Sequence, residues 1–292
     1  MKTIRFIINP ASGSGKKQHS GMTKAIEKFL DKNIYCGKIK FTQMPGHATK
    51  LGNAFRKKEF DVVVAVGGDG SVNEVGQSLI NSNTALGIIP TGSGNGLARF
   101  LKIPINIKKA IQILNQGKIQ CIDTMSINGK SFVNCAGIGF DAHISYLFAT
   151  HGKRGFKAYL RIAATEFSNY RTEKYKLKID DIEIERQAFL ICFANSSQFG
   201  NNVHIAPKAK VNDGLADVVI VKPHPYLSTF VIALQLLTKT AAKSKYVEMY
   251  QGKHIIVYNK STIKVHLDGE PAEFDGNLEI NVSPLSLKVV VP

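Results

Sequence analysis

The chain has 292 residues, enough for two globular domains of about 150 residues each. Apolar residues make up 44% of the sequence and charged residues 21%, which excludes a disordered or fibrous class. The formal net charge of +16 favours polyanionic partners: nucleotide phosphates, acidic phospholipid surfaces or nucleic acid. Because the lysines are dispersed along the chain, a solvated basic surface without a particular partner is the alternative.

Residues 1–124 alternate short apolar runs with stretches of helical spacing, which is typical of parallel strands joined by crossover helices. This pattern predicts an α/β domain. The expected strands are 4–8, 39–42, 61–66 and 85–89, and the expected helices are 22–30, 48–55, 73–80 and 96–101.

Residues 125–292 contain closely spaced β-like segments, which predict a mainly antiparallel, β-rich domain. No linker marks the boundary near 124, and the last strand is a candidate to return to the first domain. The expected strands are 174–184, 188–194, 216–221, 255–257, 263–267, 278–282 and 285–291, and the expected helices are 159–170 and 226–242.

The sequence predicts a cytoplasmic protein without a membrane span. The apolar run at the N-terminus is too short for a signal peptide, and the longest apolar segment, 226–237, falls below the ~20 residues that cross a bilayer. The four cysteines form neither a CxxC pair nor a zinc pattern, and we expect buried thiols in a reducing compartment; they are Cys36, Cys121, Cys135 and Cys192.

A glycine-rich turn follows the apolar strand in residues 62–75, VVVAVGGDGSVNEV, and opens into a helix. Glycines let the backbone bend sharply and bring its N–H groups to a phosphate, and the helix N-terminus adds a favourable dipole. Asp69 stands inside this turn, where Mg²⁺-ATP chemistry needs a carboxylate. The alternative is a tight strand-to-helix turn with a capping aspartate.

A second glycine-rich junction, 87–99 (GIIPTGSGNGLAR), follows the next expected strand. Two such junctions after adjacent parallel strands lie at one sheet edge, the usual ligand crevice of an open α/β sheet. Thr91, Ser93 and Asn95 offer neutral donors and acceptors there, although Asn95 could simply cap the next helix.

The first strand ends in a third junction, 9–16 (NPASGSGK), which superficially resembles a Walker loop. The GxxxxGK[ST] spacing fails, because Pro10 stands at the first glycine and Lys17 at the hydroxyl residue. A Rossmann GxGxxG pattern is not matched either. We therefore expect neither a P-loop nor a dinucleotide site.

The motifs GGDGSVNEV and PTGSGNGLAR together resemble the catalytic-domain signature of diacylglycerol kinases, sphingosine kinases and their bacterial lipid-kinase relatives. The resemblance covers nearly the whole chain in the same order. Its other parts are 9–13, 134–142 (NCAGIGFDA), 205–209 (IAPKA), Asp213-Gly214 and 268–271 (DGEP). It departs from the family in 199–202 (FGNN), where the family has a glycine run, and in Ser71, where threonine is commoner.

The resemblance implies an NAD kinase/diacylglycerol kinase-like α/β ATP-binding domain, 1–124, and a β-rich domain, 125–292, with ATP in the cleft between them. It implies that the DGE motif supplies the catalytic base, with Glu270 in that role, Asp268 in the same network and Asp69 as a third catalytic acid. The sequence does not decide between Asp268 and Glu270. The implied nucleotide-site residues are Asn9, Pro10, Ala11, Ser12, Gly13, Thr42, Gly67, Gly68, Asp69, Gly70, Ser71, Val72, Asn73 and Thr91.

Two magnesium sites follow from the resemblance. Asp69 and Asp123 would help to hold catalytic Mg²⁺, although Asp123 could merely end a strand. A structural Mg²⁺ would take the Asp213 carboxylate and the backbone carbonyls of Lys210 and Leu215, since oxygen ligands suit a hard cation. The alternative for Asp213-Gly214 is a hairpin turn.

The resemblance implies transfer of the γ-phosphate of Mg-ATP to a lipid hydroxyl. The DGE carboxylates agree with this activity, because a carboxylate must accept the hydroxyl proton during attack. Diacylglycerol is the first candidate acceptor, with sphingosine-type and other lipid alcohols left open. The basic segment Lys153, Arg154, Lys157 and Arg161 predicts peripheral contact with an anionic membrane, with a solvated helix face as the alternative.

Two other functions compete with a lipid kinase. An NAD kinase-like enzyme shares GGDG and the two-domain plan, but PTGSGNGLAR argues against it. A non-catalytic module that binds acidic lipid or nucleic acid explains the charge but not the DGE motif. No nucleic-acid motif is present in the sequence, so no nucleic acid is expected. Exposed strand edges in the second domain could pair two copies into a homodimer.

Overall fold

The computed structural model describes residues 1–12, 16–150 and 156–292, with the backbone alone for 16–20 and 156–157. The chain divides into two compact units, one formed by Met1–Asp123 and Leu285–Pro292, the other by Thr124–Pro284. This division differs from the expected 1–124 and 125–292 in one segment, because residues 285–292 return to the first unit as a strand beside β4.

A parallel sheet forms the centre of the first unit, with strand order β2-β1-β3-β4. The end of β18 adds beside β4 with Val289 opposite Leu86. Buried Val, Ile and Leu side chains make up β3 and β4 because both faces of a parallel sheet are covered. The strands are β1 (Lys2–Ile8), β2 (Tyr35–Phe41), β3 (Val62–Gly67), β4 (Ala85–Pro90) and β18 (Leu278–Val291).

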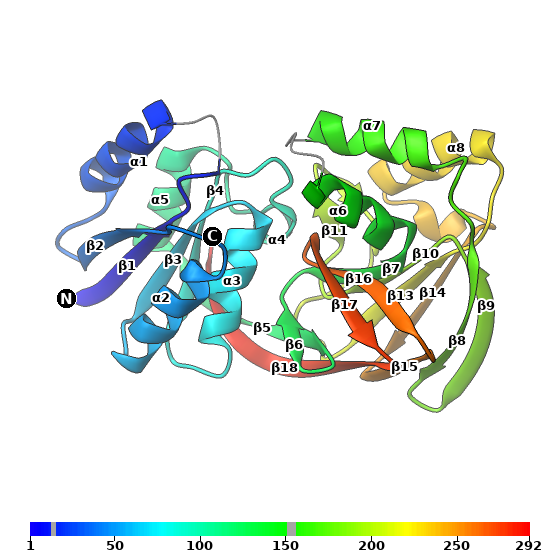
Figure 1. Ribbon diagram of the computed structural model, residues 1–292. Coiled ribbons are helices and arrows are strands. Elements are labelled where there is room, and N and C mark those ends of the chain that lie inside the picture. Colours follow the sequence, from blue (N-terminus) through cyan, green and yellow to red (C-terminus); the bar gives the residue numbers. More distant parts are fainter. Residues whose placement is uncertain (13–15, 151–155) are drawn as a thin grey trace. The chain divides into compact units, whose positions relative to one another are not determined.

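Four helices of this unit form two pairs, α2 with α3 and α1 with α5. Figure 1 shows the two pairs on opposite faces of the sheet, as right-handed crossovers require when the strand order reverses at β1. The helices are α1 (Lys16–Phe29), α2 (His47–Lys57), α3 (Asp69–Leu79), α4 (Gly96–Phe100) and α5 (Ile107–Gln116).

The second unit contains an antiparallel six-stranded sheet of order β14-β13-β10-β7-β16-β17 and a second antiparallel arrangement of β18, β15, β8 and β9. Strand β5 leads into the unit and pairs with β6. The strands are β5 (Lys118–Ile127), β6 (Lys130–Phe132), β7 (Cys135–Gly139), β8 (Glu173–Ile179), β9 (Ile182–Ala188), β10 (Leu190–Ala194), β11 (Gln198–Gly200), β12 (Val203–His204), β13 (Ala216–Val221), β14 (Val247–Gly252), β15 (His254–Tyr258), β16 (Thr262–Leu267) and β17 (Glu270–Asp275).

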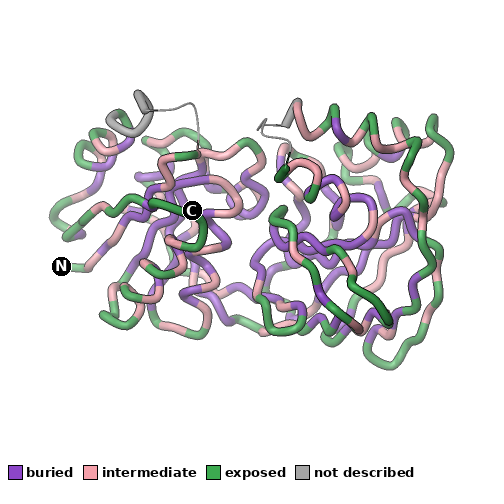
Figure 2. The backbone as a smooth tube through the Cα atoms, viewed as in Figure 1, coloured by how far each residue is buried: buried purple, intermediate pink, exposed green. Residues whose placement is uncertain are grey.

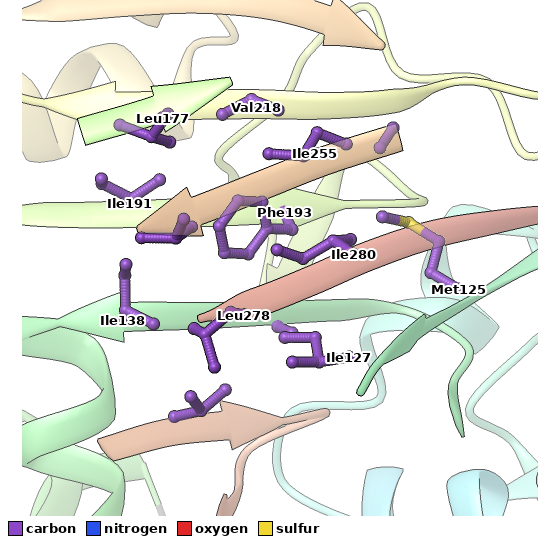
Figure 3. Close-up of a cluster of buried hydrophobic side chains, with 14 of the residues drawn as sticks. Met125, Ile127, Ile138, Leu177, Ile191, Phe193, Val218, Ile255, Leu278 and Ile280 are labelled. Carbon is purple, nitrogen blue, oxygen red and sulfur yellow. The ribbon is translucent and has the colours of Figure 1, made fainter. Parts of the chain in front are cut away.

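Both faces of the six-stranded sheet are buried. Ile191 and Phe193 of β10 pack with Leu177 and Ile255 in one core (Figure 3). Cys192, on the opposite face of β10, belongs to a second core that α6 (Phe140–Thr150), α7 (Phe156–Glu166) and α8 (Tyr226–Leu237) cover. The short 3-10 helix η1 (Ala241–Lys243) follows α8 and contacts it and β14.

The expected fold class is confirmed, since an α/β unit and a β-rich, mainly antiparallel unit are both present. Figure 2 shows that buried backbone follows the central strands, whereas exposed backbone follows the outer turns. The stretch 174–184 is not one strand but part of a hairpin, because Asp180 turns the chain with a φ of 48°. None of the described helices combines the length and apolar character that crossing a membrane requires.

Candidate active site

The carboxyl ends of β1, β3 and β4 meet at one edge of the first unit's sheet, and backbone hydrogen bonds tie the following residues together. Asn9 donates to the Val66 carbonyl across 3.1 Å, and Thr91 donates to the Gly67 carbonyl across 2.8 Å. Thr42, directly after β2, donates to the Ile8 carbonyl across 2.9 Å. The structure therefore brings three predicted nucleotide-site residues to the edge where open α/β sheets bind ligands.

Hydroxyl and amide side chains connect the turns at this edge. The Asn9 Nδ2 group donates to Ser71 Oγ at 3.1 Å, and Asn9 Oδ1 accepts from the backbone nitrogen of Ala11 at 2.9 Å. Ser12 Oγ lies 3.1 Å from Thr91 Oγ1. The first turn thus contacts both glycine-rich turns through neutral polar groups, which suit phosphate or ribose.

Asp69 links the two glycine-rich turns. Its Oδ2 accepts from the backbone nitrogen of Asn95 at 2.8 Å, and its Oδ1 accepts from that of Gly96 at 2.7 Å. Asn95 has a φ of 55°, and its side chain exchanges two hydrogen bonds with the Gly92 backbone. Burial raises the pKa of Asp69, and hydrogen bonds from the backbone N–H groups of Asn95, Gly96 and Asp69 itself oppose that rise. Asp69 is therefore both a structural clamp and the candidate metal carboxylate.

The glycines of the two turns pack backbone against backbone. A Cβ added to Gly92 would lie 2.5 Å from the Gly68 Cα, and one added to Gly67 would lie 2.3 Å from Ser71 Oγ. Since Gly68 has no side chain with which to cap α3, the first N–H groups of that helix are presented at the sheet edge. This bare helix N-terminus, next to hydroxyl groups, fits a phosphate.

Glu74 is a structural residue of the site that the sequence reasoning missed. Its Oε1 accepts from the Gly46 nitrogen at 3.1 Å and its Oε2 from the Ala48 nitrogen at 3.0 Å. The carboxylate caps α2 from α3 and interacts favourably with the α2 dipole. The presence of Glu74 within the GGDGSVNEV motif was the only sequence signal that could have indicated this role.

The remaining residues predicted for the nucleotide site are either half-buried or buried. Pro10 and Gly70 are half-buried, whereas Val72 and Asn73 are 5% and 2% exposed. The Asn73 side chain accepts from Gln77 Nε2 at 2.9 Å, so its visible role is within α3. Gly13 lies outside the described residues.

Asp123 has no exposed surface. Its Oδ1 accepts from the backbone nitrogen of Leu285 at 2.7 Å, and Leu285 has a φ of 49°. A leucine in the left-handed region is strained, and the hydrogen bond supports the chain where β18 enters the first unit. This is a structural role for Asp123, and its part in magnesium binding stays a prediction.

In the second unit, the DGE motif forms a two-residue hairpin turn between β16 and β17. Asp268 and Gly269 have φ angles of 51° and 85°, which is typical of a type I′ turn. The Asp268 carboxylate is 7% exposed and accepts from the backbone nitrogens of Val133, Asn134 and Cys135 at 2.8–2.9 Å. Those three donors hold the Asp268 carboxylate inside the protein, so the turn does not present it to solvent.

Glu270 is exposed at the start of β17. Beside the turn, His266 Nε2 lies 3.0 Å from Asp141 Oδ2, and Gly269 donates its backbone N–H to His266 Nδ1 at 3.3 Å. An Nδ1 that accepts a hydrogen bond leaves the ring proton on Nε2, facing the carboxylate. This chain of contacts fixes the hairpin that presents Glu270.

The segment expected to hold structural Mg²⁺ is an irregular turn rather than a hairpin, since β13 pairs with β10 and β14. Asp213 is exposed, and its Oδ1 accepts from the Leu215 nitrogen at 3.1 Å. Burial and then the Asp213 charge raise the pKa of Asp217 to about 6, against a hydrogen bond from Gln251. Within the described residues, Asp217 Oδ2 is buried without a hydrogen-bond partner. Asp213 and this orphaned oxygen fit a cation.

No group of three or more His, Cys, Asp or Glu side chains gathers into a metal site within residues 1–12, 16–150 and 156–292. Mg²⁺ that binds with a nucleotide commonly takes only one or two carboxylates, with phosphate and water completing its shell. The Asp69 carboxylate accepts from the backbone nitrogens of Asn95, Gly96 and Asp69 itself, and a carboxylate offers about four acceptor positions, so capacity for a cation is left. Asp69 therefore fits such a shell.

Profiles of two known families match the chain. The diacylglycerol kinase catalytic domain matches residues 3–127, and the YegS C-terminal NAD kinase beta sandwich-like domain matches residues 134–291. The diacylglycerol kinase of Bacillus subtilis is 28% identical over 285 residues, covering 94% of this chain and 93% of its own.

A probable YegS-like lipid kinase of Pseudomonas aeruginosa is 30% identical over 258 residues, covering 87% of this chain and 84% of its own. A solved structure of a putative diacylglycerol kinase from Bacillus anthracis covers 100% of this chain and 97% of its own. It has a TM-score of 0.80 at 22% identity, which shows a shared fold. The chain therefore belongs to the family of bacterial diacylglycerol kinases and YegS-like lipid kinases.

Proposed function

We propose that the protein is an ATP-dependent lipid kinase that transfers the γ-phosphoryl group of Mg-ATP to a lipid hydroxyl, with diacylglycerol as the first acceptor to test. The observation that carries the proposal is the Asp69 clamp, which joins two glycine-rich turns at the N-terminus of α3. Backbone N–H groups and one carboxylate at a sheet edge are what nucleotide phosphates with a divalent cation require. The names of the relatives support a lipid acceptor.

The residues of the first unit bind and orient the nucleotide in this mechanism. The N–H groups that open α3, together with Ser12, Ser71 and Thr91, hydrogen-bond phosphate and ribose oxygens. Asp69 would contribute its remaining acceptor capacity to the cation. Bound Mg²⁺ supplies neutralisation of the phosphate charge.

The base in this mechanism is Glu270. A lipid hydroxyl is a weak nucleophile until a carboxylate accepts its proton during attack. Asp268 is poorly suited to accept it, because three backbone N–H groups already occupy its oxygens. Glu270 is exposed on the same hairpin and can approach an acceptor. Asp268 and His266 are therefore assigned to positioning the turn.

A structural Mg²⁺ is part of the proposal. The Asp213 carboxylate with the Lys210 and Leu215 carbonyls would hold it, and the cation would relieve the buried charge of Asp217. Its binding is measured by the shift of the thermal unfolding midpoint between EDTA and Mg²⁺. That shift is expected for the wild type and not for Asp213→Ala. An equal shift in both would count against this site.

The activity is tested with purified protein, Mg²⁺ and ATP labelled at the γ position. The acceptor panel holds diacylglycerol, sphingosine, ceramide and other lipid alcohols in mixed detergent micelles, together with NAD. Label in the organic phase with a lipid acceptor supports the proposal, and Glu270→Gln should lower the rate of labelling about a hundredfold or more. Label on NAD alone indicates the NAD kinase-like alternative, and label on no acceptor overturns the kinase assignment.

A further inference from the structure

Helix α8 turns an apolar side towards solvent. Six large apolar side chains of this helix are 52–79% exposed, and at 100° per residue they fall within one arc of about 140°. We call this side the α8 apolar face; its residues are Tyr226, Leu227, Phe230, Val231, Leu234 and Leu237.

The opposite side of α8 fixes this orientation. Ile232 is 5% exposed and packs with Leu236 into the core that α6 and α7 also cover. At the start of the helix, the Tyr226 ring lies 5.3 Å from Phe167, the residue that follows α7. Figure 1 shows α7 and α8 at the same end of this unit. The helix is held with its apolar face outward.

An exposed apolar face of this kind is expected to bind a partner or a membrane. An ordinary surface helix carries polar and charged residues on its outer side, and monomeric soluble proteins rarely expose contiguous apolar patches beyond a few hundred Å². Helix α8 carries no charged residue, and its three polar residues, Ser228, Thr229 and Gln235, lie outside the exposed arc. The outward surface is therefore adapted to a non-aqueous environment.

The charges around α8 identify that environment. Between Val218 and Tyr246 the sequence has four lysines and no aspartate or glutamate. Lys222 pairs with Glu248 at 3.1 Å, and Lys239, Lys243 and Lys245 are exposed. An apolar face whose flanking sequence carries lysines and no carboxylate is typical of helices that lie in the interface of anionic membranes. Pairing two copies would instead bring these lysines together on chains that each carry +16.

We propose that the α8 apolar face inserts into the headgroup boundary of an anionic bilayer, while Lys239, Lys243 and Lys245 contact lipid phosphates. The inference rests on the proposed function for its purpose, since a kinase with a lipid acceptor must reach a membrane surface. The sequence predicted a different basic segment for membrane contact. Its residues Lys153 and Arg154, and the side chain of Lys157, lie outside the described part of the chain. Arg161 is exposed on α7.

The test is sedimentation of the full chain with vesicles of phosphatidylcholine alone or mixed with phosphatidylglycerol. The double variant Leu227→Gln/Leu234→Gln should weaken binding to the mixed vesicles about tenfold or more. Its control is Ile119→Gln/Ile182→Gln, which changes two apolar residues that are 55% and 57% exposed elsewhere. The control should bind like the wild type, and thermal unfolding verifies that all variants are folded.

The electrostatic part is tested separately. Lys239→Gln/Lys243→Gln/Lys245→Gln should weaken binding to the mixed vesicles about tenfold or more and reduce its salt dependence. The control replaces three exposed lysines elsewhere, Lys58, Lys118 and Lys260, by glutamine. Equal losses in both triple variants would show that net charge, and not this face, sets the binding.

Binding of Leu227→Gln/Leu234→Gln that equals wild-type binding overturns the inference. A wild-type dimer that this variant converts to a monomer, with vesicle binding unchanged, assigns the face to a second copy and also overturns it. Activity on micellar diacylglycerol separates the two proposals, because micelles deliver the lipid without a vesicle. A wild type that binds vesicles through α8 but is inactive on every acceptor refutes the proposed function and leaves the docking surface.

Discussion

The carboxylate of Asp69 accepts a hydrogen bond of 2.7 Å from the backbone nitrogen of Gly96, and so fixes the turn after β4 to the turn after β3. In Asp69→Asn, the side-chain amide nitrogen, itself a donor, would face a backbone N–H group of Asn95 or Gly96 that donates to the carboxylate in the wild type. We expect the free energy of unfolding to fall by about 1–3 kcal/mol and phosphoryl transfer to be lost. The control is Asp181→Asn at an exposed aspartate. Retained activity in Asp69→Asn would remove Asp69 from the site.

Gly92→Ala tests the backbone contact between the two turns. The new Cβ would lie 2.5 Å from the Gly68 Cα, so the turns must separate. We expect a loss of about 1–3 kcal/mol in the free energy of unfolding and an increase of about tenfold or more in the KM for ATP.

Gly21→Ala is the matched control for this substitution, because its new Cβ would meet no atom within 4 Å. In a helix interior it should raise the free energy of unfolding by about 0.5–1 kcal/mol. Denaturant titration and ATP kinetics measure both variants. An unchanged KM in Gly92→Ala would mean that the turns bind nucleotide independently.

Substitutions of the two acids of the DGE motif are expected to have different effects, one on catalysis and the other on stability. Glu270→Gln should lower kcat by about a hundredfold to ten thousandfold, with little change in stability because the side chain is exposed. Asp268→Asn should lower the free energy of unfolding by about 2–3 kcal/mol, since its amide would face a backbone N–H of the 133–135 segment. Product formation and urea denaturation measure the pair. The reverse pattern would assign the base to Asp268.

The lowered pKa of Glu248 predicts that the free energy of unfolding depends on pH. Burial acts to raise its pKa, but hydrogen bonds from Arg186, Tyr250 and Lys222 outweigh burial and lower it from 4.5 to about 2. A carboxyl whose pKa is lower in the folded state stabilises that state above the unfolded pKa. The contribution is lost as the pH falls through the folded value.

Glu248→Gln should therefore cost about 2–3 kcal/mol of unfolding free energy at pH 7, and less as the pH falls from 4.5 towards 2. Glu185→Gln, at an exposed neighbouring glutamate, is the control. Chemical denaturation at pH 7 and pH 3 measures both. A cost that does not change with pH would show that the charge of Glu248 does not stabilise the fold.

The sequence predicted the turns of the first unit because their signals are local. Glycine spacing after an apolar strand defines the 67–70 and 91–96 turns without reference to distant residues. Helix α5 also had a local signal, since Asn106 caps it and accepts from Lys109, but that signal was overlooked. Helix α6 had none, because apolar residues occupy most of its circumference and obscure the helical period.

The orientation of the site acids depends on distant contacts and could not be predicted. Asp268 turns inward because its partners lie 133–135 residues earlier in the chain. Asp123 is committed to Leu285, 162 residues later, and Glu74 caps α2 from the following helix. Composition and periodicity do not predict these long-range hydrogen bonds, because they form only when the sheets assemble.

The direct packing of Gly68 on Gly92 also limits how this chain can be recombined with its relatives. The first turn leaves no room for a side chain on Gly92, a side chain on Gly68 would meet Gly92 at 3.1 Å, and Asp69 of the first turn requires the N–H groups of the second. A chimera that exchanges only the 67–75 segment with a distant relative would combine turns that were not shaped for each other. Segments 67–75 and 90–96 therefore form one structural unit, although the fourteen residues 76–89 separate them in the chain.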